Sequence, residues 1–159
     1  MARAYDGSNL IKTIIINEQK TNELYSNLME QMKDEKAQAL FKKLAEDEAR
    51  HEKIYTRLLE RLPNNGVVEI SEEDALYTEA LISANVFTND KVKKRFSKDD
   101  ALILAEKVER DGIMFIEQLR NLYPALAIEE IGIILQEEKK HLQFVLDKQY
   151  TSTVGLLGL

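Results

Sequence analysis

The chain has 159 residues, a length typical of one domain with a sizeable hydrophobic core. Hydrophobic residues make up 44% and charged residues 31%, and no apolar run approaches the roughly 20 residues that span a membrane, so a disordered tail and a membrane protein are excluded. The absence of cysteine excludes disulfides, thiolate zinc sites and iron–sulfur clusters, and the net charge of −6 disfavours nucleic acid and anionic membranes as partners.

The first part of the chain is predicted to form a helical hairpin, because apolar residues recur there at helical spacing. One helix should begin near Ser8, a candidate N-cap, and run to about Lys33. A second should begin just after Asp34 and end before Pro63. The inward-facing residues are Ile11, Ile14, Thr21, Tyr25, Leu28 and Met32 in the first helix, and Phe41, Leu44, Tyr55, Leu58 and Leu62 in the second.

The last part of the chain is predicted to form a second hairpin. Ser97 followed by Asp100 is a variant capping box that opens a third long helix. This helix must end near Tyr123 because Pro124 cannot continue it. A fourth helix should run from about Ala125 to Gln149.

The segment 63–97 connects the two hairpins and is too long for a tight turn. Its stretch from Ser71 to Val86 has its own cap and apolar spacing, which predicts a short crossover helix with Ala75, Leu76, Ala80 and Leu81 as its apolar residues. We therefore expect an all-α fold: a four-helix bundle of two antiparallel helical hairpins with one long crossover containing a short helix. The bundle should occupy residues 1–150 and a tail residues 151–159.

Each long helix carries titratable residues where its inward stripe should be hydrophobic. Burying an ionised carboxylate is costly unless it is paired or bound to a metal. These residues are Glu18 in the first helix, Glu48 and His51 in the second, Glu109 in the third, and Glu138 and His141 in the fourth.

The spacing places these residues at one level of the bundle. If the first hairpin turns at Asp34, Glu18 lies 16 residues before the turn and Glu48 lies 14 after it. With the second turn at Pro124, Glu109 lies 15 residues before and Glu138 14 after. At about 1.5 Å per residue, each set falls within about one helical turn of the same height.

The two halves also repeat each other. Glu18 and Glu109 are 91 residues apart, and the two Glu-x-x-His pairs are 90 residues apart. Such a repeat indicates two related hairpins that face each other across a pseudo-twofold axis. Two Glu-x-x-His pairs, with one glutamate from each remaining helix, are the recurring ligands of paired iron or manganese in bundle cores. We therefore expect a site for two metal ions, and the donor types do not decide between iron and manganese.

Surface glutamates could produce such pairs by chance, since the chain has nineteen. Yet both of its two histidines follow a glutamate by three residues, which chance gives roughly one or two times in a hundred. Glu106, one turn before Glu109, is expected to be a flanking or solvated carboxylate, with a ligand role as the minority alternative. Tyr25 is expected to be a core aromatic whose hydroxyl could hold a ligand in place.

Residues 8–149 resemble the ferritin-like superfamily and, within it, the rubrerythrin-like di-iron carboxylate branch. The resemblance rests on NEQKTNELY, LFKKLAEDEARHEKIY, LAEKVERDGIMF and LQEEKKHLQFVL. It implies that Glu18 and Glu109 are terminal metal ligands. It also implies that Glu48 and Glu138 bridge the two metals and that His51 and His141 each complete one.

The chain departs from this branch at two positions on the third helix. Rubrerythrins have a further glutamate one turn after the third-helix ligand, where this chain has Gly112. They often have tyrosine two turns after that ligand, where this chain has Ile116. The remaining six ligands resemble a ferritin oxidation centre equally well.

The resemblance implies a non-haem di-iron oxidoreductase that reduces oxygen or hydrogen peroxide, with peroxidase or ferroxidase activity in oxidative stress or iron homeostasis. Without a cysteine iron centre, electrons must come from an external donor such as a rubredoxin-type protein. We expect a homo-oligomer, a dimer. The N-terminal MARAYDGSNL lacks the pattern of a signal peptide, so we expect a cytoplasmic location.

Two alternative functions stay open. The tail TSTVGLLGL is similar to the C-terminal peptides that dock ferritin-like cargo in encapsulin shells, so an iron-storage protein that feeds a mineral is one alternative. The simpler interpretation of this tail is an apolar segment packed on its own bundle or on a neighbouring subunit. A monomer or dimer that holds no more than about two irons per chain would exclude self-contained storage. A helical interaction module without metal is the other alternative, which metal analysis would identify.

Overall fold

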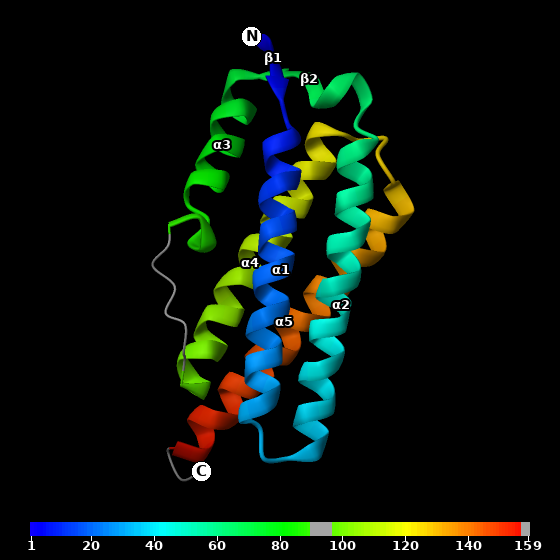
Figure 1. Ribbon diagram of the computed structural model, residues 1–159. Helices are drawn as coiled ribbons and strands as arrows, with labels where there is room; N and C mark the ends of the chain where they lie inside the picture. Colours follow the sequence, from blue (N-terminus) through cyan, green and yellow to red (C-terminus); the bar gives the residue numbers. More distant parts are fainter. Residues whose placement is uncertain (90–96, 157–159) are drawn as a thin grey trace.

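The computed structural model describes residues 1–89 and 97–156. Its four long helices form a bundle, and a shorter helix lies outside it (Figure 1). The long helices are α1 (Ser8–Gln31), α2 (Glu35–Glu60), α4 (Lys98–Leu122) and α5 (Ile128–Leu156). The predicted all-α fold of two antiparallel hairpins joined by a long crossover is confirmed.

The helix boundaries follow the capping signals in the sequence. Asp34 caps α2, its side chain accepting hydrogen bonds from the backbone N–H groups of Lys36 and Ala37 at 3.3 Å. Ser97 caps α4 and accepts from the N–H of Asp100 at 3.2 Å. These side chains satisfy N–H groups that lack a partner within the first helical turn, which fixes where the chain enters each helix.

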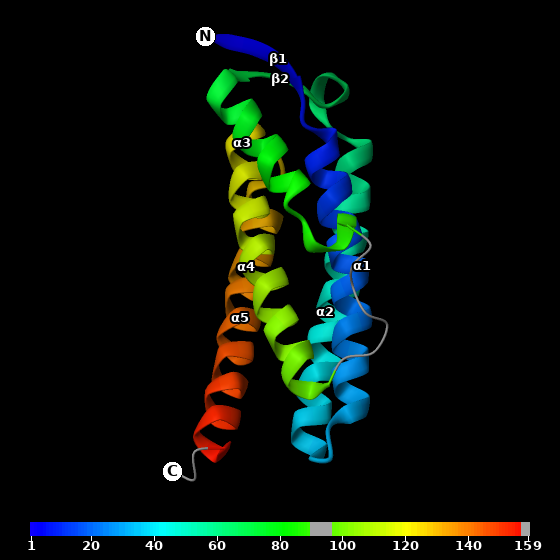
Figure 2. The same cartoon turned by 90° about the vertical axis from the view of Figure 1, so that its left-hand side faces the viewer.

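The crossover contains α3 (Glu72–Ser83), flanked by the short 3-10 helices η1 (Pro63–Gly66) and η2 (Val86–Asn89). Ser71 caps α3 as predicted. The helix lies against α1 and α4 on the outside of the bundle (Figure 2). Of the apolar residues that predicted this helix, Ala75 is buried and Leu81 half-buried, but Leu76 is 55% exposed.

Ala80, the fourth of these apolar residues, is also exposed. Thr78 is instead fully buried against the bundle. The Thr78 hydroxyl accepts a hydrogen bond of 2.8 Å from Nε2 of Gln118 on α4. A polar pair therefore holds α3 on the bundle, which apolar spacing cannot reveal.

A two-stranded ribbon at one end of the bundle was not predicted. Strand β1 (Ala2–Asp6) pairs antiparallel with β2 (Val67–Ser71), so that Ala2 lies opposite Ser71 and Asp6 opposite Val67. The ribbon changes how α1 begins. The cap position is Gly7 rather than Ser8, and the Asp6 carboxylate accepts a hydrogen bond of 3.0 Å from the Ser8 N–H.

The ends of α5 differ from those expected. The helix begins at Ile128, three residues after the predicted start, because the chain first makes a turn in which Ala127 has a φ of 39°. It continues to Leu156 instead of ending near Gln149. A glycine such as Gly155 weakens a helix by only about 1 kcal/mol, so it does not force an end. The last tail residues, 157–159, lie outside the described residues.

The hydrophobic core consists of two apolar clusters, one toward each end of the bundle. The cluster near the ribbon includes Ile14, Tyr55, Phe115 and Leu135, and the other includes Leu24, Ala45, Val108 and Val145. On each long helix, the predicted titratable residues fall between the members of these two clusters. None of the helices in the described ranges combines the length and apolarity needed to cross a membrane.

Candidate metal centre

The structure buries all six titratable side chains that interrupt the apolar stripes. Each of them is at most 6% exposed. We call them together the Glu–His centre; its members are Glu18 on α1, Glu48 and His51 on α2, Glu109 on α4, and Glu138 and His141 on α5. Every long helix contributes, as the sequence predicts.

The donor atoms of the Glu–His centre gather in two overlapping groups of four. Within each group, the carboxylate oxygens and imidazole nitrogens lie within 4.8 Å of one another. One group is Glu18, Glu48, His51 and Glu138, and the other is Glu48, Glu109, Glu138 and His141. Glu48 and Glu138 belong to both groups, so the two groups overlap through two shared carboxylates.

The contacts of the two histidines repeat across the halves of the chain. Nδ1 of His51 lies 2.9 Å from Oε1 of Glu138, and Nδ1 of His141 lies 2.9 Å from Oε1 of Glu48. Each imidazole thus contacts the shared glutamate of the opposite hairpin. The two rings stack with centroids 6.0 Å apart. This arrangement agrees with the pseudo-twofold relation predicted from the residue offsets.

Two further carboxylates, missed in the sequence, contact the outer nitrogens of the histidines. Asp47 lies 3.0 Å from Nε2 of His141, and Glu137 lies 3.3 Å from Nε2 of His51. We call Asp47 and Glu137 the outer carboxylates. An outer carboxylate that accepts the Nε2–H leaves Nδ1 free to bind a metal and fixes the ring orientation.

The outer carboxylates are held by cations. The guanidinium of Arg50 donates to Asp47 at 3.3 Å and also donates to Glu137, so that it connects α2 with α5. Lys43 forms an ion pair of 3.1 Å with Asp47. A signal for the outer carboxylates was present in the sequence, because each directly precedes a shared glutamate and the two are 90 residues apart.

Burial and mutual repulsion divide the four central carboxyl groups into two kinds. Burial, followed by the charges of Glu48 and Glu138, raises the pKa of Glu18 well above its usual value, and the pKa of Glu109 is raised for the same reasons. Burial also opposes ionisation of Glu48 and Glu138, but hydrogen bonds outweigh it and lower their pKa values. The shared glutamates are therefore the ionised pair in the metal-free protein.

The same network favours protonated imidazoles. Burial alone would lower the pKa of His51, but the carboxylates of Glu138 and Glu18, 2.9 and 3.5 Å from Nδ1, raise it above its usual value. Burial is likewise outweighed at His141, where hydrogen bonds with Asp47 and Glu109 raise the pKa. Protons thus occupy the space between the carboxylates in the metal-free protein, and a bound cation would have to displace them.

Two neighbours of the Glu–His centre, Tyr25 and Glu106, differ in their contacts. The Tyr25 hydroxyl is buried and donates a hydrogen bond to Oε1 of Glu109, as expected of a residue that holds a ligand in place. Glu106 is half-buried and accepts from Arg110 at 2.9 Å. It is not a member of either donor group, so its position is that of a flanking carboxylate.

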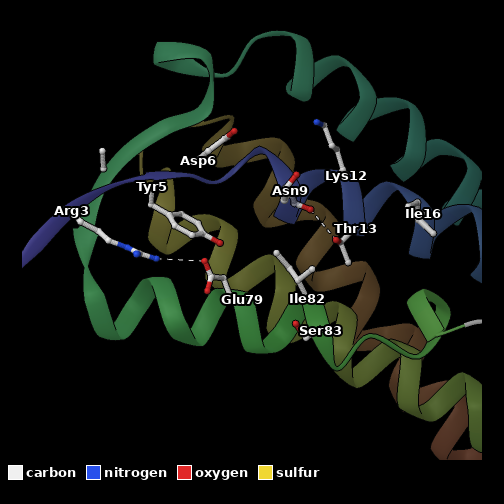
Figure 3. Close-up of a pocket in the computed structure, with 11 residues that line it drawn as sticks. Arg3, Tyr5, Asp6, Asn9, Lys12, Thr13, Ile16, Glu79, Ile82 and Ser83 are labelled. Atoms are coloured by element: carbon white, nitrogen blue, oxygen red, sulfur yellow. Dashed lines mark hydrogen bonds and ion pairs between the residues drawn. The ribbon is translucent and has the colours of Figure 1, made fainter.

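An open hollow of about 700 Å³ lies away from the Glu–His centre, between β1, the start of α1 and α3 (Figure 3). Its lining mixes charges of both signs, including Arg3 and Lys12 with Asp6 and Glu79. Arg3 and Glu79 already pair with each other across it. No member of the Glu–His centre lines this hollow, so it offers no route to that centre.

The sequence model of the rubrerythrin family matches residues 9–148. The chain belongs to the rubrerythrin family. This is a family of ferritin-like di-iron carboxylate proteins, so the matched region and the buried Glu–His centre agree with each other. No curated protein and no solved structure gives a match to the chain.

The donors fit the metal that the rubrerythrin family implies. Carboxylate and imidazole donors suit iron or manganese, and each donor group supplies four buried residues around one position. Oε2 of Glu18 is buried, accepts no well-aligned hydrogen bond among the described residues and lies 3.5 Å from Nδ1 of His51, which leaves this carboxylate oxygen available to a cation. A metal-binding site is therefore what this part of the bundle supports.

Proposed function

We propose that the chain is a non-haem di-iron oxidoreductase that uses a pair of Fe(II) ions to reduce hydrogen peroxide or oxygen, as a peroxidase or ferroxidase. The observation that carries this proposal is the pair of buried four-residue donor groups that share two glutamates. A pair of Fe(II) ions bound here would supply two electrons, one from each ion. Hydrogen peroxide would accept these two electrons and two protons, yielding two water molecules.

Each residue of the Glu–His centre has a separate role in the proposal. Glu18 and His51 would hold one ion, and Glu109 and His141 would hold the other. Glu48 and Glu138, which belong to both donor groups, would contribute to both positions. Because carboxylate side chains can turn about their own bonds, these glutamates would adjust to both iron oxidation states without movement of the helices.

The surrounding residues keep the imidazoles aligned and the centre dry. Asp47 and Glu137 accept the Nε2–H protons, which leaves both Nδ1 atoms facing the two donor groups. The apolar clusters on both sides limit the water that reaches the centre. A dry, preorganised site strengthens the interaction between carboxylates and cations, since the local dielectric constant is low.

The reaction with oxidant tests this proposal. Protein loaded anaerobically with Fe(II) should develop the absorbance of ferric iron when rapidly mixed with hydrogen peroxide or oxygen. Glu48→Ala should slow this oxidation, because it removes a carboxylate from both donor groups. Glu46→Ala, at an exposed position two residues away on α2, is the matched control and should react like the unmodified protein. Oxidation no faster in the unmodified protein than in Glu48→Ala would refute the proposal.

A further inference from the structure

The pseudo-twofold relation assigns each residue beside the Glu–His centre a counterpart in the other half. Offsets of 91 residues for α1 with α4 and 90 for α2 with α5 relate Tyr25 to Ile116 and Tyr55 to Val145. All four side chains are at most 1% exposed. Tyr25 and Val145 belong to the apolar cluster on one side of the centre, and Ile116 and Tyr55 to the cluster on the other.

Of these four residues, one tyrosine and one aliphatic residue thus lie on each side of the centre. The two tyrosines, however, are on helices that the pseudo-twofold relation does not pair with each other. On one side the tyrosine is on α1 and the aliphatic residue on α5. On the other side the tyrosine is on α2 and the aliphatic residue on α4. Ile116 occupies the position equivalent to Tyr25 but has no hydroxyl group. Tyr55 brings a hydroxyl group into the same apolar cluster as Ile116.

The two hydroxyl groups differ in their hydrogen bonds. The Tyr25 hydroxyl donates to Glu109, whereas the Tyr55 hydroxyl has no partner among the described residues. Glu18 is the counterpart of Glu109; its buried Oε2 accepts no well-aligned hydrogen bond in the described part of the chain and lies 3.5 Å from Nδ1 of His51. Tyr55 lies one helical turn after His51 on α2, the residue whose Nδ1 is 3.5 Å from Oε2 of Glu18. Burial and then the charge of Glu18 raise the pKa of Tyr55, in agreement with this placement.

An unpartnered hydroxyl inside an apolar cluster is unfavourable, at a cost of about 1–3 kcal/mol. Phenylalanine would fill the same space without that cost. We propose that Tyr55 is a positioning residue: its hydroxyl donates a hydrogen bond to Glu18 when that carboxylate binds metal, as Tyr25 does for Glu109. This inference rests on the proposed metal centre, and it assigns the donor on the Glu18 side to α2 instead of α4.

Binding of Co(II) to the full metal-free chain tests the role of Tyr55. The unmodified protein should bind two ions, each with its own absorption band. Tyr55→Phe should weaken one of the two binding steps about 10-fold and alter the band of that ion alone. Tyr25→Phe should weaken the other step, and the double variant should show both losses. Tyr77→Phe, at a position that is 45% exposed on α3, is the control.

Unfolding of the metal-free proteins separates positioning from a structural role. Tyr55→Phe should be at least as stable as the unmodified protein, because it removes a hydroxyl that has no partner. Tyr25→Phe should be less stable, because it removes the bond to Glu109.

The inference is overturned if Tyr55→Phe binds both ions with unchanged constants and bands, or if it destabilises the metal-free protein as Tyr25→Phe does. If the unmodified protein binds no Co(II), the proposed function fails as well. Two ions bound normally by both the unmodified protein and Tyr55→Phe would refute this inference alone.

Discussion

At the scale of single residues, both ring nitrogens of each histidine in the Glu–His centre contact a carboxylate. Nδ1 of His141 faces the shared glutamates, while its Nε2 lies 3.0 Å from the outer carboxylate of Asp47. Burial opposes ionisation of Asp47, but hydrogen bonds with His141 and Lys43 outweigh it and lower its pKa. Asp47 therefore stays ionised at neutral pH and accepts the Nε2–H, so the ring presents Nδ1 to the shared glutamates.

Replacing an outer carboxylate by its amide should weaken metal binding. We expect Asp47→Asn to lower the affinity for Co(II) or Mn(II) by about 10- to 100-fold, because the amide holds the imidazole less firmly and makes it a poorer ligand. Glu46→Gln, on the same helix but exposed, should leave the affinity unchanged. Equal affinities in the two variants would show that Asp47 does not act through His141.

The protonation of the centre predicts how the metal-free protein responds to pH. The pKa values of His51 and His141 are raised from 6.5, and those of Glu18 and Glu109 from 4.5, so the folded state binds more protons than the unfolded chain above those values. Stability must then fall as pH rises, because deprotonation favours the unfolded state. The pKa values of Glu48 and Glu138 are lowered from 4.5, so their stabilising contribution should be lost as these groups are protonated below about pH 4.5.

The melting temperature of the metal-free protein should therefore fall between about pH 6 and about pH 9. Metal binding should release protons and remove most of this dependence, since the ions replace the protons at Nδ1. Thermal unfolding followed by circular dichroism, with and without Mn(II), measures both effects. A melting temperature that rises with pH in the metal-free protein would contradict the assigned protonation states.

At the scale of elements, the ribbon is joined to the bundle through a close packing contact at Gly7. A Cβ atom at Gly7 would overlap the Tyr123 hydroxyl and lie 3.1 Å from Cδ1 of Leu122. The Tyr123 hydroxyl donates to the carbonyl oxygen of Gly66, and the Gly7 N–H donates to the same oxygen at 3.0 Å. The junction of β1 with α1 therefore packs directly on the end of α4.

Gly7→Ala should destabilise the protein by about 1–3 kcal/mol, because Tyr123 must move away from Gly66. Gly7 has a φ of −81°, which alanine adopts readily, so backbone strain does not add to the effect of the close contact. Gly112→Ala is the opposite case, since a Cβ at Gly112 on α4 would meet nothing within 4 Å. It should stabilise by about 0.5–1 kcal/mol through helix propensity. Urea unfolding of both variants compares the two effects, and equal shifts would contradict the packing argument.

At the scale of the whole molecule, the bundle and its centre were predictable because both depend on local periodicity. Asp34 and Ser97 mark helix starts by capping, and buried charges such as Glu18 interrupt an apolar stripe. The ribbon was not predictable in this way, because its two five-residue strands are far apart in sequence and neither has a strong signal of its own. Thr78 was missed for a related reason, since its partner lies on another helix.

Metal should contribute to the stability of the whole bundle. The metal-free protein places four carboxyl groups and two imidazoles between its apolar clusters, where only protons and hydrogen bonds offset their charges. A metal concentration 100-fold above the dissociation constant should add about 2.7 kcal/mol to the free energy of unfolding. Thermal unfolding with Mn(II), then after addition of a chelator, measures this. An unchanged melting temperature would count against a bound metal.

The β1–β2 ribbon closes the first half of the chain on itself. It pairs residues 2–6 with residues 67–71, which brackets the α1–α2 hairpin at its open end, whereas α5 ends at the opposite end of the bundle from the ribbon (Figure 1). Local opening should therefore begin in the second hairpin. Amide hydrogens of α1 and α2 should exchange with deuterium more slowly than those of α4 and α5, so the two otherwise similar halves would differ in their dynamics.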